Sequence, residues 1–163
     1  TDLPGPDHAE IDRVTSDPER FLALIDDREA AGDPIEQPDG SFVPRLPGLR
    51  RWMWDGEFAG GVSLRWQPGT TDLPATCLGH IGYAVVPWKR RRGYATSGLA
   101  AMLPIAAAEG LPFVDITADL ENVASQRVIE ANGGVLEEVF TKLASSGGGQ
   151  AKQYRVDLSR FRV

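Results

Sequence analysis

The sequence predicts a single α/β domain built on a mixed sheet. Its 163 residues suit one domain with one sizeable core. Hydrophobic residues make up 42% of the chain and charged residues 25%, a balance typical of folded globular proteins. Apolar segments follow one another as helix, hairpin strands, strand, helix, strand, helix and closing hairpin, and this alternation is typical of α/β folds.

The N-terminal third predicts one helix followed by a loop. Ser16-Asp17-Pro18-Glu19 favours a helix start, because proline is accommodated in the first helical turn. Gly32-Asp33-Pro34 ends this helix, and the proline and glycine content of residues 33–48 predicts an irregular loop. The apolar stripe of the helix comprises Phe21, Leu22, Leu24 and Ile25.

A hairpin and a third strand are predicted next. Residues 51–54 lead into Asp55-Gly56, a favoured tight turn, and residues 58–66 return as the second strand. Residues 68–74 form a loop between two prolines. The third strand covers residues 80–86 and stops at Pro87, which has no N–H for a strand ladder.

The C-terminal half alternates helices and strands. Pro104 lies inside the first of these helices and removes a hydrogen bond to the carbonyl of Ala100, so we expect a bend there. Asn122 is a good cap for the second helix, which ends at Gly133-Gly134. The predicted elements are helices at 96–109 and 123–131 and strands at 113–117, 135–143 and 153–158.

Composition and charge exclude several functional classes. The formal net charge of −6 argues against general nucleic-acid binding, which depends on lysine and arginine facing phosphates. Cys77 is the only cysteine, so it forms neither an intramolecular disulfide nor a cysteine metal cluster, and we expect a small core residue. No apolar run reaches the roughly 20 residues of a membrane helix, and the first residues do not resemble a secretion signal. We therefore expect a cytoplasmic protein that binds neither membranes nor metal.

One basic cluster stands out in this acidic chain. Lys89 to Arg92 lie between the strand that ends at Pro87 and the helix that follows, with Gly93 at the turn. Backbone N–H groups at a helix N-terminus lack intrahelical partners, and the helix dipole adds positive potential. A loop curled around glycine aims several such groups at one phosphate. The segment therefore predicts a pyrophosphate site, and the alternative is a solvated basic loop.

Two motifs resemble the GNAT superfamily of N-acyltransferases. Arg90-x-x-Gly93-x-Ala95 is similar to its acyl-CoA pyrophosphate motif, and Asn122 to Gly133 is similar in spacing to its second block. Gly79 to Tyr83 resembles a bacterial branch of acetyltransferases in particular. The resemblance covers about residues 50–158 and implies one GNAT domain over residues 1–163, with residues 1–48 more variable. Its implied fold is a twisted, mostly antiparallel sheet of about six to seven strands flanked by helices, with splayed central strands.

The resemblance also implies roles at individual positions. The co-substrate would be acetyl-CoA, whose acetyl group moves to a primary amine of a small molecule or peptide. The backbones of Val85 and Val86 would bind the pantetheine arm, and Asn122 and Ser125 would contact it, although both also suit helix capping. We expect a monomer or homodimer without metal. The residues implied to hold the pyrophosphate are Arg90, Arg91, Arg92, Gly93, Tyr94, Ala95 and Thr96.

Acetyl transfer needs an amine that has lost a proton and a thiolate that gains one. Many family members carry a tyrosine for the second step where this chain has Ile129. His80 is a candidate base because its ordinary pKa suits neutral pH, and its alternative is a structural strand histidine. Tyr154 on the closing strand is the candidate acid. Tyr83 also offers a hydroxyl group, but strand alternation places it on the face opposite His80.

Two other functions remain open from the sequence. Because of Ile129, the chain is alternatively a catalytically inactive domain that binds acyl-CoA. Lys89 to Arg92 alternatively form a docking patch for a nucleic acid or partner, which the net acidity disfavours. The acceptor pocket is expected between the N-terminal region and the loops at 33–48 and 68–76. The acidic side chains of this region would attract a cationic amine, and the alternative is that they form a solvated face. They are Asp26, Asp27, Glu29, Asp33 and Glu36.

Overall fold

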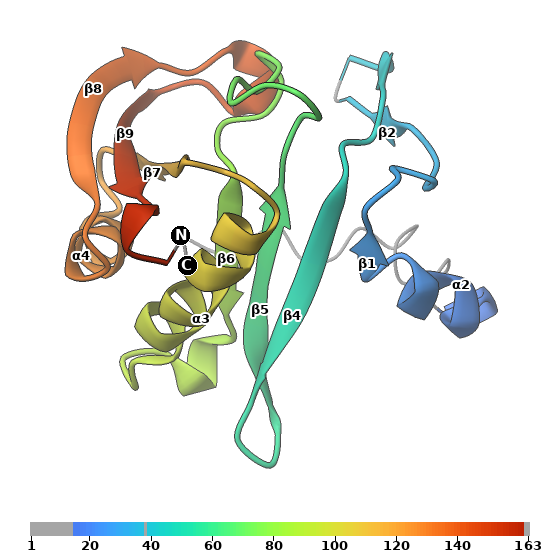
Figure 1. Cartoon of the computed structure of the whole chain (residues 1–163), viewed down its shortest axis with the longest axis horizontal. Coiled ribbons are helices and arrows are strands. Elements are labelled where there is room, and N and C mark those ends of the chain that lie inside the picture. Colours follow the sequence, from blue (N-terminus) through green and yellow to red (C-terminus); the bar gives the residue numbers. More distant parts are fainter. Residues whose placement is uncertain (1–14, 38, 162–163) are drawn as a thin grey trace.

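The computed structural model describes residues 15–37 and 39–161 (Figure 1). The α-helices in this part are α2 (Pro18–Ala23), α3 (Tyr94–Ala108) and α4 (Val123–Ala131), and short 3-10 turns are η1 (Pro87–Lys89), η2 (Ala144–Ser146) and η3 (Ser159–Phe161). The strands are β1 (Asp26–Asp27), β2 (Ile35–Glu36), β3 (Phe42–Val43), β4 (Gly48–Trp54), β5 (Phe58–Arg65), β6 (Ile81–Val85), β7 (Phe113–Asp119), β8 (Val135–Thr141) and β9 (Gln150–Asp157).

The first sheet has the order β1-β4-β5-β6, with antiparallel neighbours throughout. The predicted hairpin of β4 and β5 is confirmed, and its turn contains Gly56 at a φ of 104°, which other residues rarely adopt. Side chains alternate along β5, so Val62 and Leu64 enter the core while Ser63 and Arg65 face the other way. The first sheet therefore has one face on the core and a second face that carries polar groups.

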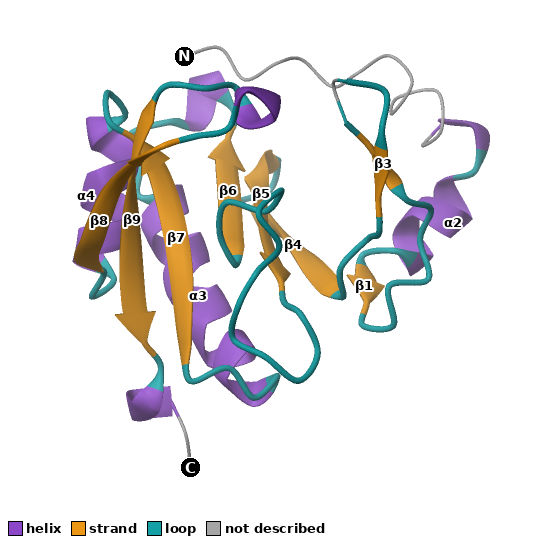
Figure 2. Cartoon of the chain, turned by 90° about the horizontal axis from the view of Figure 1, so that it is seen from above, coloured by secondary structure: helices purple, strands orange, loops and turns teal. Residues whose placement is uncertain are grey.

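The second sheet has the order β7-β9-β8, and its pairings are also antiparallel. Helix α3 connects β6 in the first sheet to β7 in the second, and these two strands point the same way in Figure 2. A long helical crossover is what a pair of parallel strands requires. The mixed character of the predicted fold is therefore confined to the junction of the two sheets.

The two sheets separate between β6 and β7. They are joined where the chain enters β6, because the His80 N–H donates to the Asp115 carbonyl over 2.7 Å. Beyond that point β6 and β7 belong to different sheets, so the outer edge of β6 lies along an opening. The predicted splay of the central strands is confirmed, and this opening organises the functional site.

Helices α3 and α4 lie on the same face of the two sheets and bury the core against it (Figure 1). Asn132, at the end of α4, donates from Nδ2 to the Thr96 carbonyl in the first turn of α3 over 3.2 Å. The start of α3 is therefore held by the second helix as well as by the sheet. Fully buried core side chains include Leu64, Leu99, Met102, Leu103, Ile116, Ile129, Tyr154 and Leu158.

The N-terminal segment lies beside β4, on the side away from the second sheet (Figures 1 and 2). Helix α2 begins as predicted, with Pro18 in its first turn and the Asp17 side chain accepting from the Arg20 amide over 3.0 Å. The prediction of an irregular loop at 33–48 is wrong in part. Strands β2 and β3 form a small antiparallel hairpin there, in which Ile35 pairs with Val43 and Glu36 with Phe42 across a turn that contains Gly40.

The boundaries of the closing strands also differ from the predictions. Strand β8 ends at Thr141 rather than at residue 143, and β9 begins at Gln150, three residues before its predicted start. The register explains this, because Thr141 pairs with Gln150 directly beside the glycine-rich connection. Within the described ranges, no helix is long and apolar enough to cross a membrane.

Candidate active site

The outer edge of β6 forms one wall of the opening. The Val86 N–H donates to the Ala59 carbonyl over 3.0 Å, so the alternating pattern of an antiparallel pair turns the backbone of Val85 outward. The Val85 carbonyl accepts from Arg90 Nε over 3.2 Å. The Val86 carbonyl accepts from the Lys89 N–H over 3.0 Å, so the protein already engages both backbone groups of Val86. Val85 therefore remains the better placed of the two predicted pantetheine contacts.

The loop from Arg90 to Thr96 presents backbone N–H groups to one side. Gly93 is the N-cap of α3 with φ of 83° and ψ of 0°, and no side chain caps the helix. Among the described residues, no hydrogen-bond acceptor reaches the six N–H groups from Arg91 to Thr96, whereas the Ser97 N–H bonds to the Gly93 carbonyl. Arg91 also has a positive φ, of 61°. Free donors at the positive end of a fifteen-residue helix are an arrangement that suits an anion.

The hairpin between β4 and β5 supports this loop from below. The Asp55 carboxylate accepts from Lys89 Nζ over 2.9 Å and from the Tyr94 hydroxyl. Lys89 also pairs with Glu57 over 3.0 Å. Hydrogen bonds from Tyr94 and Lys89 lower the pKa of Asp55 to about 2, so this carboxylate is charged at neutral pH. Lys89 is therefore neutralised locally, and the exposed cations of the loop are Arg90, Arg91 and Arg92.

A pair of hydroxyl groups links β6 to the start of α4. The Asn122 side chain accepts from the Ser125 N–H over 3.1 Å, which is the capping role considered in the sequence. Ser125 Oγ lies 2.7 Å from the Tyr83 hydroxyl, and that hydroxyl also donates to the Ser125 carbonyl over 3.2 Å. Tyrosine keeps its proton at neutral pH, and burial raises the pKa of Tyr83 further. The opening therefore has a proton donor at its edge.

His80 occupies the junction of the two sheets and is 1% exposed. Its Nδ1 accepts from the Asp115 N–H over 3.0 Å, so the proton of the neutral ring resides on Nε2. Burial lowers the pKa of His80, and the Asp115 carboxylate only partly offsets this effect. The single lone pair that a base needs is thus occupied by a backbone amide. This geometry favours the structural alternative for His80 over the catalytic one.

Tyr154 lies in the core and is 1% exposed. It lies on β9 opposite Ile116 of β7, and its hydroxyl donates to Glu130 on α4 over 3.1 Å. Strand β7 separates β9 from the opening, so Tyr154 lies farther from the edge of β6 than Tyr83 does. Ile129 is fully buried in the same core. The geometry therefore favours Tyr83 over Tyr154 as the proton donor near the opening.

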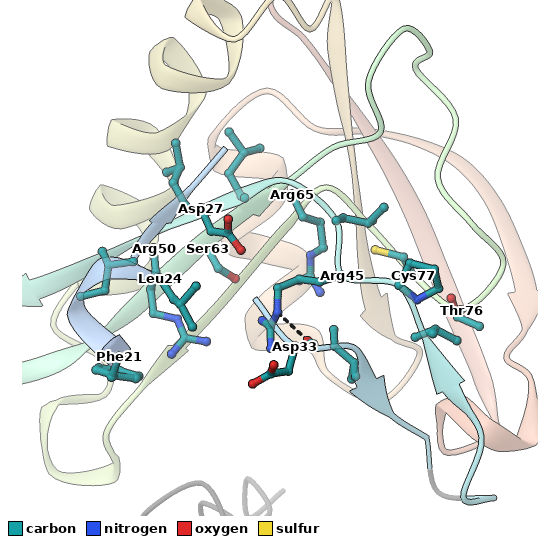
Figure 3. Close-up of a pocket in the computed structure, with 18 of the residues that line it drawn as sticks. Phe21, Leu24, Asp27, Asp33, Arg45, Arg50, Ser63, Arg65, Thr76 and Cys77 are labelled. Atoms are coloured by element: carbon teal, nitrogen blue, oxygen red, sulfur yellow. Dashed lines mark hydrogen bonds between the residues drawn. The ribbon is translucent and has the colours of Figure 1, made fainter. Parts of the chain in front are cut away.

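A cavity of about 660 Å³ lies between the N-terminal segment and the ends of β4 and β5 (Figure 3). We call it the arginine cavity, because its walls include four arginines. An adjoining hollow of about 500 Å³, here called the sheet hollow, shares Phe21, Arg50 and Ser63 with it. The sheet hollow continues over Gly82 to Tyr83 and Ala84. The arginines of the cavity are Arg20, Arg45, Arg50 and Arg65.

Sequence reasoning placed the acceptor pocket in this region but did not identify its arginines. Three of the acidic residues that it considered are engaged: Asp26 pairs with Arg51 over 2.6 Å, Asp33 pairs with Arg20 over 2.9 Å, and Asp27 accepts from backbone amides. Alternation along β5 was the available signal, because it places Arg65 on the face away from the core. Within the described ranges, no three His, Cys, Asp or Glu side chains are grouped to hold a metal ion.

Residues 7–135 of the chain match the protein family described as Acetyltransferase (GNAT) domain. No curated protein matches the sequence significantly. Among solved structures, the chain is similar to yncA from Salmonella typhimurium with its cofactor acetyl-CoA. The identity is 14% and the TM-score 0.56, over 92% of this chain and 74% of that one.

Two further structures show the same likeness. A mutant of spermidine N-acetyltransferase SpeG from Vibrio cholerae is 16% identical with a TM-score of 0.55, over 70% of this chain and 68% of that one. The microcin C7 self immunity acetyltransferase MccE, in complex with acetyl-CoA and AMP, is 17% identical with a TM-score of 0.53, over 68% of this chain. The chain spans 61% of that protein's length. At such identities the likeness shows a shared fold.

Proposed function

The chain belongs to the GNAT acetyltransferase family, and on that premise we propose that it transfers the acetyl group of acetyl-CoA directly to a primary amine. The observation that carries this proposal is the row of free N–H groups from Arg91 to Thr96 at the start of α3. A pyrophosphate fits such a row, because each N–H donates a charge-assisted hydrogen bond to a phosphate oxygen. The arginines at 90 to 92 add charge complementarity.

The structure also offers space for that ligand. Apart from Gly93 and its two chain neighbours, no atom of the described residues lies within 4 Å of the position that a Cβ on Gly93 would occupy, so the loop is open on this side. The outward backbone of Val85 and the hydroxyl of Ser125 flank the opening that leads away from the loop. We assign Val85, Asn122 and Ser125 to the pantetheine wall, and Arg90 to Thr96 to the pyrophosphate.

When bound, acetyl-CoA supplies an activated thioester for attack by a neutral amine. The new N–C bond forms as the C–S bond breaks, and the departing sulfur takes a proton. Tyr83 holds such a proton at its hydroxyl, since the ordinary pKa of tyrosine lies far above neutral pH and burial raises it further. Its hydrogen bond to Ser125 orients that hydroxyl at the edge of β6. We assign Tyr83 as the acid, in place of Tyr154, and water that reaches the open site as the route for the amine proton.

Replacing Tyr83 by phenylalanine is expected to lower kcat by about 100-fold with little change in acetyl-CoA affinity, since general acids contribute on that scale. Tyr154→Phe is the matched control, because it removes a hydroxyl that is also hydrogen bonded and shielded from solvent. Its kcat should stay within about twofold of the parent chain. Equal kcat values for both variants would remove Tyr83 from the mechanism. A fall of kcat in Tyr154→Phe alone would instead identify Tyr154 as the acid.

One observation supports a second function, a domain that binds acyl-CoA without turnover. Ile129 is fully buried where the family resemblance implies a tyrosine, so the usual acid is missing. Release of free CoA thiol from acetyl-CoA, followed across a broad panel of primary amines, separates the two functions. Turnover with any amine supports the enzyme, whereas binding without turnover across the panel supports the second function.

A further inference from the structure

The arginine cavity has an excess of unpaired positive charge, although the whole chain has a net charge of −6. Its three carboxylates are already engaged by the protein. Asp33 pairs with Arg20 over 2.9 Å, and Asp17 caps α2. The two oxygens of Asp27 accept from the Ala31 and Gly32 amides over 2.7 and 3.1 Å. None of these carboxylates therefore serves the three remaining guanidinium groups.

Those three groups belong to Arg45, Arg50 and Arg65. Among the residues that the structure describes, the Arg45 side chain donates to the backbone carbonyl of Asp33 alone, over 3.1 Å. Within the described ranges, the guanidinium group of Arg50 has no hydrogen bond or ion pair, and Arg65 Nε is shielded from solvent with no partner. A shielded donor without an acceptor is costly, and an anion would supply one acceptor for several donors at once. Figure 3 shows these side chains around the cavity.

The position of Arg65 connects the cavity to the proposed reaction. A Cβ built on Gly82 would lie 2.8 Å from Arg65 Nη2, so the guanidinium rests against Gly82 on the strand that borders the opening. Tyr83, the proposed acid, is the next residue, and its side chain leaves the opposite face of β6 to reach Ser125 on α4. The sheet hollow runs from Arg50 and Ser63 over Gly82 to Ala84. Small residues of β5 and β6 line it and leave room for a ligand.

We propose that the acceptor is an amine that also carries a carboxylate or phosphate group, and that Arg65, Arg50 and Arg45 bind this anionic group. The inference rests on the proposed acetyl transfer. The anion lies in the arginine cavity, and the amine end extends along the sheet hollow toward Tyr83. Two residues along a strand span roughly 7 Å. A small molecule is therefore long enough to hold its anionic group in the arginine cavity and its amine in the sheet hollow. Asp26, Asp27 and Asp33 of the N-terminal region already have partners within the protein, so they do not select a polycation as the acceptor.

The direct test measures anion binding in the presence of saturating CoA, which fills the pyrophosphate loop. Inorganic phosphate and malonate are added separately, and chloride at equal ionic strength is the reference. At about ten times its dissociation constant, either anion should raise Tm by roughly 3 °C in the parent chain. The rise should be lost in Arg65→Gln and in Arg50→Gln, and the latter changes an exposed side chain that the fold does not need.

Arg51→Gln is the matched control, because it removes the same charge from the neighbouring position of β4, where Arg51 pairs with Asp26 instead of lining the cavity. This variant should keep the full anion response. An anion response no larger than that of chloride, or one equal in all variants, would overturn the inference. The stabilisation by CoA itself is measured in the same series, so its absence would count against the proposed function and not against the anion site.

Matched acceptors then distinguish the two sources of negative charge. β-Alanine is compared with ethylamine, and phosphoethanolamine with ethanolamine, by the rate of CoA thiol release. We expect kcat/KM for one charged member to exceed that of its partner by about 10- to 100-fold, the scale of a hydrogen bond to a charged group. Arg65→Gln should erase this preference, so that the charged and uncharged members of each pair react with similar kcat/KM. Faster turnover of both uncharged amines would contradict the inference while supporting acetyl transfer.

Discussion

Gly93→Val is expected to lower the affinity for acetyl-CoA by about 100-fold while the fold persists. Gly93 has a φ of 83°, a region that a β-branched residue rarely adopts. Valine would turn the backbone of the loop and misdirect the N–H groups that precede and follow it. Beyond the chain neighbours of Gly93, no atom in the described ranges lies within 4 Å of the added Cβ position, so the change acts on the loop conformation and not on core packing. Calorimetric titration of both proteins measures the effect.

Gly110→Val is the matched control for this experiment. Gly110 has a φ of 93°, likewise with no atom within 4 Å of a Cβ, and it follows the other end of α3. The fifteen residues of that helix separate the two sites by roughly 22 Å. The control should lose comparable stability and keep its affinity for acetyl-CoA. Equal losses of affinity in both variants would show that backbone strain, and not the cradle, is responsible.

Single replacements of the loop arginines by alanine should cost less, about three- to tenfold each in affinity, because backbone groups supply most of the hydrogen bonds. The positive φ of Arg91 makes Arg91→Gly the gentler variant, since glycine adopts that conformation without strain. A loss for any one arginine as large as that of Gly93→Val would instead assign the binding energy to side chains.

His80→Ala is expected to lower the free energy of unfolding by about 3 kcal/mol, the second large effect. The change leaves a cavity at the junction of the sheets and removes the acceptor for the Asp115 N–H. For a chain of this size, the corresponding fall in Tm is roughly 6–12 °C. His80→Gln should be milder, because its side-chain oxygen offers an acceptor. Urea denaturation measures both variants.

The pH dependence separates this structural role from a catalytic one. Because the folded-state pKa of His80 is lowered from 6.5, the unfolded chain takes up its proton first on acidification. The stabilisation is complete above pH 6.5 and is lost as the pH falls below that value, and His80→Gln should remove this part of the pH dependence. The acidic limb of kcat/KM should survive in His80→Gln. Its disappearance would return His80 to the role of base.

The features that the sequence predicted well depend on local chemistry. The conformation of Gly93 and the cap at Asn122 follow from a few neighbouring residues, so the motif and its helices could be located without a structure. The hairpin of β4 and β5 was predictable for the same reason. The family match over residues 7–135 confirms the fold that these two blocks implied.

The features that could not be predicted depend on contacts between distant residues. The role of His80 is set by the amide of Asp115, and the charge of Lys89 is compensated by Asp55 on a preceding hairpin. Tyr83 meets Ser125 across the opening, a contact that no periodicity indicates. The arginine cavity likewise combines residues from β4, β5 and the loop before them. Local patterns therefore located the cofactor loop but not the groups around the acceptor.

The most direct test of the central claim is a calorimetric titration of the purified chain with acetyl-CoA. We expect saturable binding of one acetyl-CoA per chain, accompanied by a rise in Tm, because the ligand binds the native state alone. Both signals should be lost at the same concentrations in Gly93→Val and kept in Gly110→Val. The absence of heat and of thermal stabilisation at millimolar acetyl-CoA in the parent chain would contradict the account.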